Sequence, residues 1–340
     1  MNSISGYKLA VSSAILLCLL PLFTFCGKSD DIKEEEALES VQVAYNQAQS
    51  IIQNSNISEA FLFFTDPHLL SGENQFSQAT KNNLNDSFKS AKDLYDKLML
   101  DFCLCGGDWL NQRDSQEMAK EKLLYADQLM KATFGKYYKI MGNHDTNYQG
   151  FISKNNKQRG DLPRSFIDND YFSETGSAFY SFDGRETRFF ILDSGLDWTP
   201  WMDEYRWEQI LWLAEELRAN DREHIVIGIH MFYSEDRITP MSEILIKLCD
   251  AFNEKRIIAI GDREFDYTVA KGKIHLILSG HNHIDSLTYE GEGQDIPVVQ
   301  TCNYTINSKQ TFDLCLMDYN QMVVMMIRVG QGENRRVKLH

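Results

Sequence analysis

The sequence predicts an α/β fold with two packed β-sheets, and three observations lead to that prediction. Short apolar runs of strand length alternate with helical stretches through most of the chain. The C-terminal third is instead a series of short apolar runs typical of strands. With 340 residues, of which 43% are hydrophobic, the chain can bury a large core. Such a pattern is typical of sheets layered with helices around one core.

The N-terminal half contributes three predicted strands, and each ends in a polar motif. Before them, residues 36–54 have the spacing of a helix that either packs on the domain or extends a spacer. The strands are expected at 61–65, 98–105 and 137–141, with helices over 77–98 and 115–133. The strands end in Asp66-Pro67-His68, Gly106-Gly107-Asp108 and Gly142-Asn143-His144-Asp145. Glycine lets the chain turn sharply at such points.

The rest of the chain repeats this arrangement. Residues 150–177 are polar and irregular, and they predict a loop over the site. A hairpin is expected over 178–193, with its turn at Asp183-Gly184. Predicted helices cover 203–219 and 241–254, and predicted strands cover 224–229 and 274–278. These two strands end at His230 and in Ser279-Gly280-His281-Asn282-His283.

The polar residues at these strand ends form one candidate set of ligands. Its members are Asp66, His68, Asp108, Asn143, His144, His230, His281 and His283. Loops beyond the carboxyl ends of strands are where ligands converge in α/β sheets. The chain has eight histidines, and five of them belong to this set. Imidazoles with carboxylates suit zinc, iron or manganese, so the set predicts a two-metal hydrolase site.

These motifs, in this order, resemble those of the calcineurin-like metallophosphoesterase superfamily. The series is Asp-x-His, Gly-Gly-Asp, Gly-Asn-His-Asp, a lone histidine after a strand, and Gly-His-x-His. It runs from Asp66 to His283, over most of the chain. The resemblance implies a four-layer α-β-β-α sandwich, in which helices flank two mixed sheets and the metal site lies at the carboxyl ends of the strands. It also implies hydrolysis of a phosphate mono- or diester by metal-bound hydroxide.

Carried over to this chain, the family pattern implies a role for each motif residue. One metal ion would be held by Asp66, His68 and His283. The other would be held by Asn143, His230 and His281, and Asp108 would bridge the two. His144 would be catalytic, as a proton donor or a stabiliser of the transition state. The cofactors implied are two divalent or trivalent ions of manganese, iron or zinc.

Three positions depart from the pattern. Leu69 replaces a glycine that often follows Asp-x-His, and this would crowd the first metal. Asn111 stands where some branches carry an aspartate that orients the catalytic histidine, so Asp145 becomes the candidate partner of His144 by adjacency. Trp109 follows Asp108 where purple acid phosphatases carry a ligating tyrosine, and an indole cannot bind a metal. The candidate substrate contacts are Asn111, Arg113, Trp198 and Trp201.

Other chemically active residues receive structural interpretations. His224, His275 and His340 lie outside the motifs, and Gly261-Asp262 is interpreted as a turn although it mimics Gly-Gly-Asp. Five cysteines are scattered through the chain beyond residue 26. Of these, Cys103 and Cys105 read as small buried hydrophobes, and a Cys302–Cys315 disulfide stays open.

The first 26 residues are predicted to be a targeting segment. Lys8 precedes an uncharged run over 9–25, which is short for a membrane span of ~20 residues and is interrupted by Pro21. Cys26 and the polar residues after it resemble a bacterial lipoprotein signal, although Phe25 stands where a small residue is usual; uncleaved anchoring or cleavage nearby are the alternatives. We therefore expect export and lipidation at Cys26, with the protein anchored in the cell envelope; an outer-membrane address is compatible with the acidic residues that follow.

The chain is thus expected to have four segments. They are a signal or lipoprotein segment (1–26), an acidic tether and helix (27–55), the catalytic domain (56–330) and a C-terminal tail (331–340). The formal charge of −15 argues against binding duplex nucleic acid. The expected partner is a small phosphorylated substrate, with nucleotides among the candidates, and the sequence assigns no oligomeric state.

The sequence leaves two other classes of function to consider. A catalytically silent, surface-tethered binding protein on the same fold is the main alternative, and the presence of both His144 and Asp108 speaks against it. A zinc-dependent hydrolase of peptides or amides lacks support, because the chain has no His-Glu-x-x-His helix.

Overall fold

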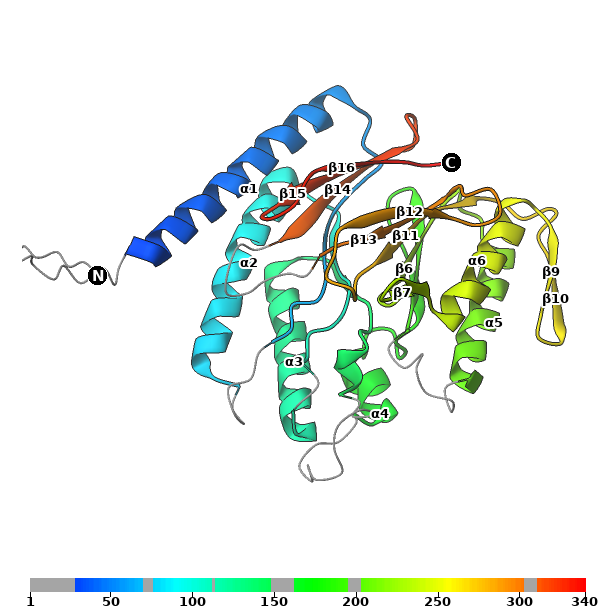
Figure 1. Cartoon of the computed structure of the whole chain (residues 1–340), viewed down its shortest axis with the longest axis horizontal. Helices are drawn as coiled ribbons and strands as arrows, with labels where there is room; N and C mark the ends of the chain where they lie inside the picture. Colours follow the sequence, from blue (N-terminus) through cyan, green and yellow to red (C-terminus); the bar gives the residue numbers. More distant parts are fainter. Residues whose placement is uncertain (1–27, 70–75, 112–113, 148–161, 195–202, 303–310) are drawn as a thin grey trace, which may run out of the picture.

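The computed structural model describes residues 28–69, 76–111, 114–147, 162–194, 203–302 and 311–340. Two six-stranded mixed sheets pack against each other, and helices cover their outer faces (Figure 1). The predicted four-layer α-β-β-α architecture is confirmed. Among the described residues, no helix combines the length and the apolar character needed to cross a bilayer.

The first sheet has the strand order β16-β15-β14-β1-β2-β3, and its parallel pairs are β1–β2 and β2–β3. Helices α1, α2 and α3 lie on its outer side (Figure 1). The strands are β1 (Glu59–Phe64), β2 (Phe102–Cys105), β3 (Tyr137–Lys139), β14 (Phe312–Asp318), β15 (Val323–Val329) and β16 (Arg335–Lys338). The helices are α1 (Lys28–Asn54), α2 (Gln78–Leu98) and α3 (Gln116–Thr133).

The second sheet has the order β12-β13-β11-β6-β5-β4, with β13, β11, β6 and β5 parallel. Helices α5 (Asp203–Ala219) and α6 (Pro240–Asn253) lie on its outer side (Figure 1). Its strands are β4 (Tyr180–Asp183), β5 (Thr187–Leu192), β6 (His224–Ile229), β11 (Lys273–Ser279), β12 (Ser286–Glu290) and β13 (Ile296–Gln300). Two small hairpins are β7 (Tyr233–Ser234) with β8 (Arg237–Ile238), and β9 (Ile257–Ile260) with β10 (Arg263–Asp266).

Aromatic side chains join the two sheets. The Phe61 ring stacks on Phe102 within the first sheet at 4.8 Å between centroids. It also meets Phe189 of the second sheet edge-on at 5.7 Å. Such pairs add about 0.5–1.5 kcal/mol each beyond the area they bury. The sheets are therefore held in a fixed relation, and the loops at their shared edge inherit that relation.

Both ends of the described chain differ from the predicted segments. The expected helix over 36–54 begins earlier, at Lys28, and it packs on the domain through Val41, Ala44 and Ala48, which are buried against α2 and β15. Residues 331–340 are not a tail, because Arg335–Lys338 form β16 and pair with β15. Val337 of β16 is buried. The strand was not predicted because Val337 is its one apolar residue and the other three are charged.

Residues 162–177 are more ordered than a polar loop. Arg164–Phe166 (α4) and Ile167–Tyr171 (η2) form two short helical turns, since Phe166, Ile167 and Tyr171 recur at helical spacing and are buried. By contrast, Gly261-Asp262 is the turn between β9 and β10, as predicted. Cys103 and Cys105 are buried hydrophobes, and Cys302 and Cys315 are both free thiols.

Candidate metal centre

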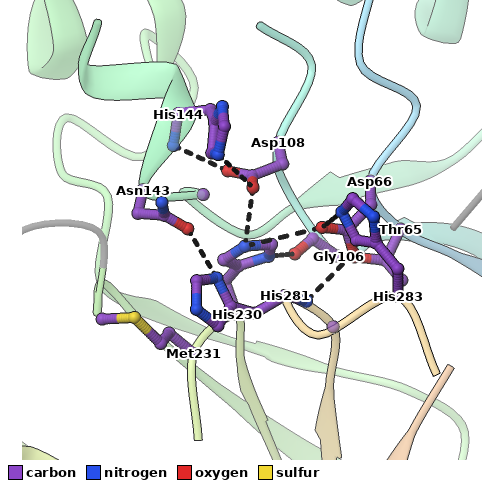
Figure 2. Close-up of polar contacts among 12 residues, drawn as sticks. Thr65, Asp66, Gly106, Asp108, Asn143, His144, His230, Met231, His281 and His283 are labelled. Carbon is purple, nitrogen blue, oxygen red and sulfur yellow. Dashed lines mark hydrogen bonds and ion pairs between the residues drawn. The ribbon is translucent and has the colours of Figure 1, made fainter. Parts of the chain in front are cut away.

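The polar motifs converge because the strands that precede them end at one edge. Phe64 lies beside Cys105, and Cys105 lies beside Lys139, so β1, β2 and β3 end level with each other. In the second sheet, β6 and β11 are also parallel neighbours. Figure 2 shows the result, with His230 between Asp108 on one side and Asp66 on the other.

Five of the motif residues have a left-handed backbone. The φ angles are 55° at Asp66, 40° at His68, 60° at Asp108, 77° at His281 and 56° at His283. A residue other than glycine rarely adopts this conformation, which costs about 1–3 kcal/mol each time. The surrounding structure must hold these residues in place, and such strain concentrates at functional sites.

Two glycines allow the motif loops to touch. A Cβ atom added at Gly142 would lie 2.1 Å from the backbone nitrogen of Asp108 and 2.1 Å from its Oδ1. One added at Gly280 would lie 2.1 Å from Thr65 Oγ1 and 2.6 Å from Asp66 Oδ2. Only a glycine fits at these two positions, so the Gly-Asn-His and Gly-His-x-His motifs begin with the residue that close packing requires.

Two imidazole rings are oriented by hydrogen bonds from Nδ1 to the backbone. His68 Nδ1 lies 2.9 Å from the carbonyl oxygen of Leu110, and His230 Nδ1 lies 2.7 Å from that of Gly106. Each Nδ1 therefore carries the proton and donates it. This arrangement makes Nε2 of each ring the nitrogen that faces the cluster and can bind a metal once it is deprotonated.

Three buried atoms in the middle of the site have no hydrogen-bond partner among the described residues. They are Asp66 Oδ1, Asp108 Oδ2 and His230 Nε2. His230 Nε2 lies 3.1 Å from Asp108 Oδ2 and 3.9 Å from Asp66 Oδ1. Buried polar atoms without partners are costly, so their convergence fits bound cations.

Around these atoms the described ligands fall into overlapping groups. Asp66, His68 and His283 form one, and Asp108, His230 and His281 form another, with the ligand atoms of each group within 4.8 Å of one another. A third group joins His68, Asp108 and His144. Asp108 thus lies between the first two groups, in the place that a bridging carboxylate needs. The donor set of imidazoles and carboxylates fits two transition-metal ions.

Other ligand atoms face each other in pairs. His68 Nε2 lies 2.9 Å from His283 Nε2. His281 Nδ1 lies 2.9 Å from Asn143 Oδ1 (Figure 2). His283 is the most exposed of these ligands, with a side chain that is 44% accessible. Each pair consists of two atoms that can donate a lone pair to the same cation.

The charges of the site favour a cation. Burial opposes a charge on His230, yet the carboxylates of Asp108 and Asp66 raise its pKa to about 10. Burial likewise opposes ionisation of Asp66, but the nearby imidazoles of His230, His283 and His68 hold its pKa well below the usual value. In the absence of metal, a proton on His230 compensates the two carboxylates, and a metal ion would take over that role.

His144 lies at the edge of the cluster. Its backbone N–H donates to Asp108 Oδ1 at 2.8 Å, and its Nε2 is 3.9 Å from Asp108 Oδ2. Burial lowers the pKa of His144, although Asp108 acts in the opposite direction. Its Nδ1 is buried and has no partner among the described residues.

The expectation that Asp145 orients His144 is wrong. Both oxygens of the buried Asp145 carboxylate accept backbone N–H groups, from Asp108 and Gly142 on one oxygen and from Leu110 on the other. Asp145 therefore ties the Gly-Gly-Asp loop to the Gly-Asn-His loop. Adjacency in sequence misled because the short helix η1 (His144–Thr146) turns successive side chains in different directions.

The remaining predicted residues have varied positions. Trp109 is buried against Phe64 and Phe88, and Leu69 is also part of the core. Asn111 is partly exposed in the loop after β2. Arg113, Trp198, Trp201 and Cys26 lie outside the described residues.

Sequence reasoning missed several supporting groups. Thr65 Oγ1 donates to Asp66 Oδ2 at 2.7 Å, and the backbone N–H of His281 donates to the same oxygen at 3.0 Å. Ser279 Oγ donates to the carbonyl oxygen of His230 at 2.8 Å. The available signal was position, since Thr65 and Ser279 each stand at a strand end immediately before a motif.

Comparison with known proteins places this geometry in context. Residues 60–285 match the family model of the calcineurin-like phosphoesterases. No curated protein matches the chain. A solved dimetal phosphatase from Danio rerio is similar, with a TM-score of 0.59 and 12% identity over 84% of this chain and 100% of the other. Purple acid phosphatase PPD1 from yellow lupin seeds has a TM-score of 0.50 and 15% identity, over 84% of this chain and 54% of the other. At these identities the two structures bear on the fold alone.

Proposed function

The chain belongs to the calcineurin-like phosphoesterase family, and from this we propose that it is a binuclear metal-dependent hydrolase of phosphate mono- or diesters. The observation that carries the proposal is the convergence of Asp66 Oδ1, Asp108 Oδ2 and His230 Nε2, three buried atoms without partners among the described residues. Lone pairs from four further ligands surround them. This donor set suits manganese, iron or zinc.

Each residue then has a defined task. Asp66, His68 and His283 would hold one ion, Asn143, His230 and His281 the other, and Asp108 would contact both. Bound metals would supply the chemistry of a two-metal site, lowering the pKa of a water molecule and neutralising phosphoryl oxygens. Leu110 and Gly106 hold the imidazoles of His68 and His230 through their carbonyl oxygens.

His144 would act on the leaving group. Its side chain is 26% exposed, so a substrate can reach it, and its Nε2 points toward Asp108 Oδ2. We assign that Nε2 the transfer of a proton to the leaving oxygen, a step that contributes about 10²–10⁴-fold in other enzymes.

The N-terminal segment is the basis for a proposed location of the protein, and that location suggests a class of substrate. The apolar run before Cys26 motivates export and a lipid anchor in the cell envelope, and this is a proposal from sequence. An exported phosphoesterase would meet organic phosphates outside the cytoplasm, nucleotides among them. Accumulation of an unprocessed chain in the cytoplasm of its host would contradict this part of the proposal.

Hydrolysis of p-nitrophenyl phosphate and of its bis-ester tests the function. We expect the manganese-loaded protein to turn over at least one of them, and the Asp108→Asn variant to lose most of that activity. An Asp101→Asn variant serves as the control, because Asp101 stands immediately before β2, away from the site, and pairs with Arg185. A protein that binds metal and hydrolyses neither ester, nor any phosphate in a wider panel, would instead favour the silent binding protein.

A further inference from the structure

A buried arginine, Arg328, and a partly buried one, Arg335, lie beside the loop that carries His281 and His283. Arg328 on β15 and Arg335 on β16 belong to the first sheet, whereas the loop joins β11 to β12 in the second. The Arg328 side chain is only 1% exposed. The site described above uses neither arginine, so their burial needs another explanation.

The register of the first sheet places these arginines at the same edge as the metal centre. Asp313 lies opposite Phe63 of β1, three residues before Asp66, and Asp313 also lies opposite Arg328. Arg328 Nε is 3.1 Å from Asp313 Oδ1. Arg335 donates to Asp313 Oδ2 as well. Asp313 is therefore the anchor of the network in the first sheet.

The same arginines reach across to the second sheet. Arg328 donates to Asp285 Oδ1, and the backbone N–H of Cys302 donates to that oxygen at 3.0 Å. Arg335 donates to the carbonyl oxygen of Gln300 at 2.6 Å and to Thr301 Oγ1 at 3.0 Å. Asp285 stands two residues after His283, so its position fixes the far end of the histidine loop.

The near end of the loop is fixed separately. The backbone N–H of Gly280 donates to the carbonyl oxygen of His230 at 3.0 Å, and Gln300 Nε2 donates to the carbonyl oxygen of Gly280 at 3.1 Å. Between Gly280 and Asp285, both histidines have a positive φ and His283 is largely exposed. Asn282 makes two hydrogen bonds with the backbone of Glu235, and these hold the loop just before His283. Beyond Asn282, the placement of His283 depends on the end of the loop at Asp285.

We propose that Arg328, held by Asp313 and paired with Asp285, is a positioning residue that keeps His283 against Asp66 and His68. Arg335 supports the same arrangement through Asp313 and Thr301. The four ionised side chains Arg328, Arg335, Asp285 and Asp313 sum to zero charge, so the network can be buried without a counter-ion. This inference rests on the proposed function, because His283 matters here as a metal ligand.

Manganese binding to the full chain tests the inference. The titration is followed by electron paramagnetic resonance, which distinguishes a coupled ion pair from a single ion. We expect Asp285→Asn and Arg328→Met to lower the binding affinity for one of the two manganese ions about tenfold or more. Residues that hydrogen-bond to metal ligands typically contribute about 10–100-fold in affinity. Arg328→Lys, which keeps the charge, should lie between Arg328→Met and wild type. His283→Ala should weaken the binding of the same one of the two ions.

A matched control removes another arginine–carboxylate pair. Arg188 on β5 pairs with Asp183 at the opposite end of the strands, so Arg188→Met should leave both manganese constants within about twofold of wild type. Equal weakening of both ions in Asp285→Asn, or wild-type constants in all the network variants, would overturn the inference. Asp285→Asn carries the test if Arg328→Met does not fold, because Asp285 is partly exposed and asparagine keeps the acceptor oxygen.

Amide hydrogen exchange separates this inference from the proposed function. In metal-free protein, Asp285→Asn should speed exchange over residues 280–286 and leave the Asp108 and His144 loops unchanged. A wild-type chain that binds no metal would refute the proposed function, and the exchange data would still decide whether Asp285 anchors the loop. Unchanged exchange over 280–286 would refute the anchoring itself.

Discussion

At the scale of single residues, several side chains of the site are oriented by hydrogen bonds to the backbone. His68 and His230 each donate a ring N–H to a backbone carbonyl oxygen, and both carboxylate oxygens of Asp145 accept backbone N–H groups. These contacts fix orientation before any metal binds. A metal centre prepared in this way loses little entropy when it fills.

Replacing His144 by alanine should lower kcat on p-nitrophenyl phosphate by about 10²-fold or more, because proton transfer by a placed side chain contributes 10²–10⁴-fold. Metal content should not change, since neither of the groups proposed to hold the ions, Asp66–His68–His283 and Asp108–His230–His281, includes His144. Steady-state kinetics with metal analysis of the same sample measures both. Undiminished kcat with both metals in place would remove His144 from the mechanism.

Metal affinity should rise with pH. The pKa of His230 is raised to about 10 in the metal-free fold, so the ring keeps its proton across the neutral range and a metal must displace it. Each pH unit below 10 should therefore cost about tenfold in manganese affinity for one proton released. For the same reason, the stability that this proton gives the metal-free protein is complete below about pH 6.5 and is lost as the pH rises toward 10. Titrations at pH 6, 7 and 8 check the slope, and a flat profile would contradict it.

Gly142→Ala should weaken metal binding and lower the melting temperature. The new methyl group would meet the Asp108 backbone and carboxylate at 2.1 Å, and such overpacking costs about 1–3 kcal/mol. Gly135→Ala is the control, because the nearest atom to its added Cβ is 3.9 Å away. Calorimetry of both metal-free variants gives the comparison. Equal stability of the two would show that the loops can separate without cost.

The residue scale also shows what a sequence can predict about a site. The converging ligands could be predicted because each stands directly after an apolar run, and parallel strands end at one edge. The structural role of Asp145 could not be predicted, because it depends on which loop packs against this residue in the folded chain. The cross-sheet contacts of Arg328 and Arg335 were invisible for the same reason, since Asp285 and Asp313 are far from them in sequence.

At the scale of elements, α1 is part of the domain. Ala44 and Ala48 are buried against the first sheet and α2, so the helix packs rather than acting as a free spacer. The sequence left this open because alanine suits both a packed and a solvated helix. The boundaries of β16 were missed because its residues are mostly charged.

Ala48→Asp should therefore destabilise the fold by about 2–4 kcal/mol, the cost of placing an unpaired charge in a buried position. Gln49→Asp makes a similar change at the next position, which is exposed, and should cost less than about 0.5 kcal/mol. Urea unfolding of the two variants distinguishes them. Equal midpoints would mean that α1 does not pack in solution as it does in the structure.

At the scale of the whole molecule, the site exists because two sheets meet. Asp66, Asp108 and Asn143 follow strands of the first sheet, whereas His230, His281 and His283 follow strands of the second. The two groups proposed to hold the metal ions, Asp66–His68–His283 and Asp108–His230–His281, each combine ligands from both sheets. The aromatic contacts among Phe61, Phe102 and Phe189 and the contacts of the buried Arg328 therefore serve the chemistry as well as the fold.

The central claim is that this shared edge binds two metal ions, and anomalous diffraction from manganese-soaked crystals tests it most directly. Two peaks should lie ~3.5–4 Å apart. One should contact Asp66, His68 and His283, the other Asn143, His230 and His281, with Asp108 touching both. A single peak, or none at this edge in crystals that hold manganese elsewhere, would contradict the account.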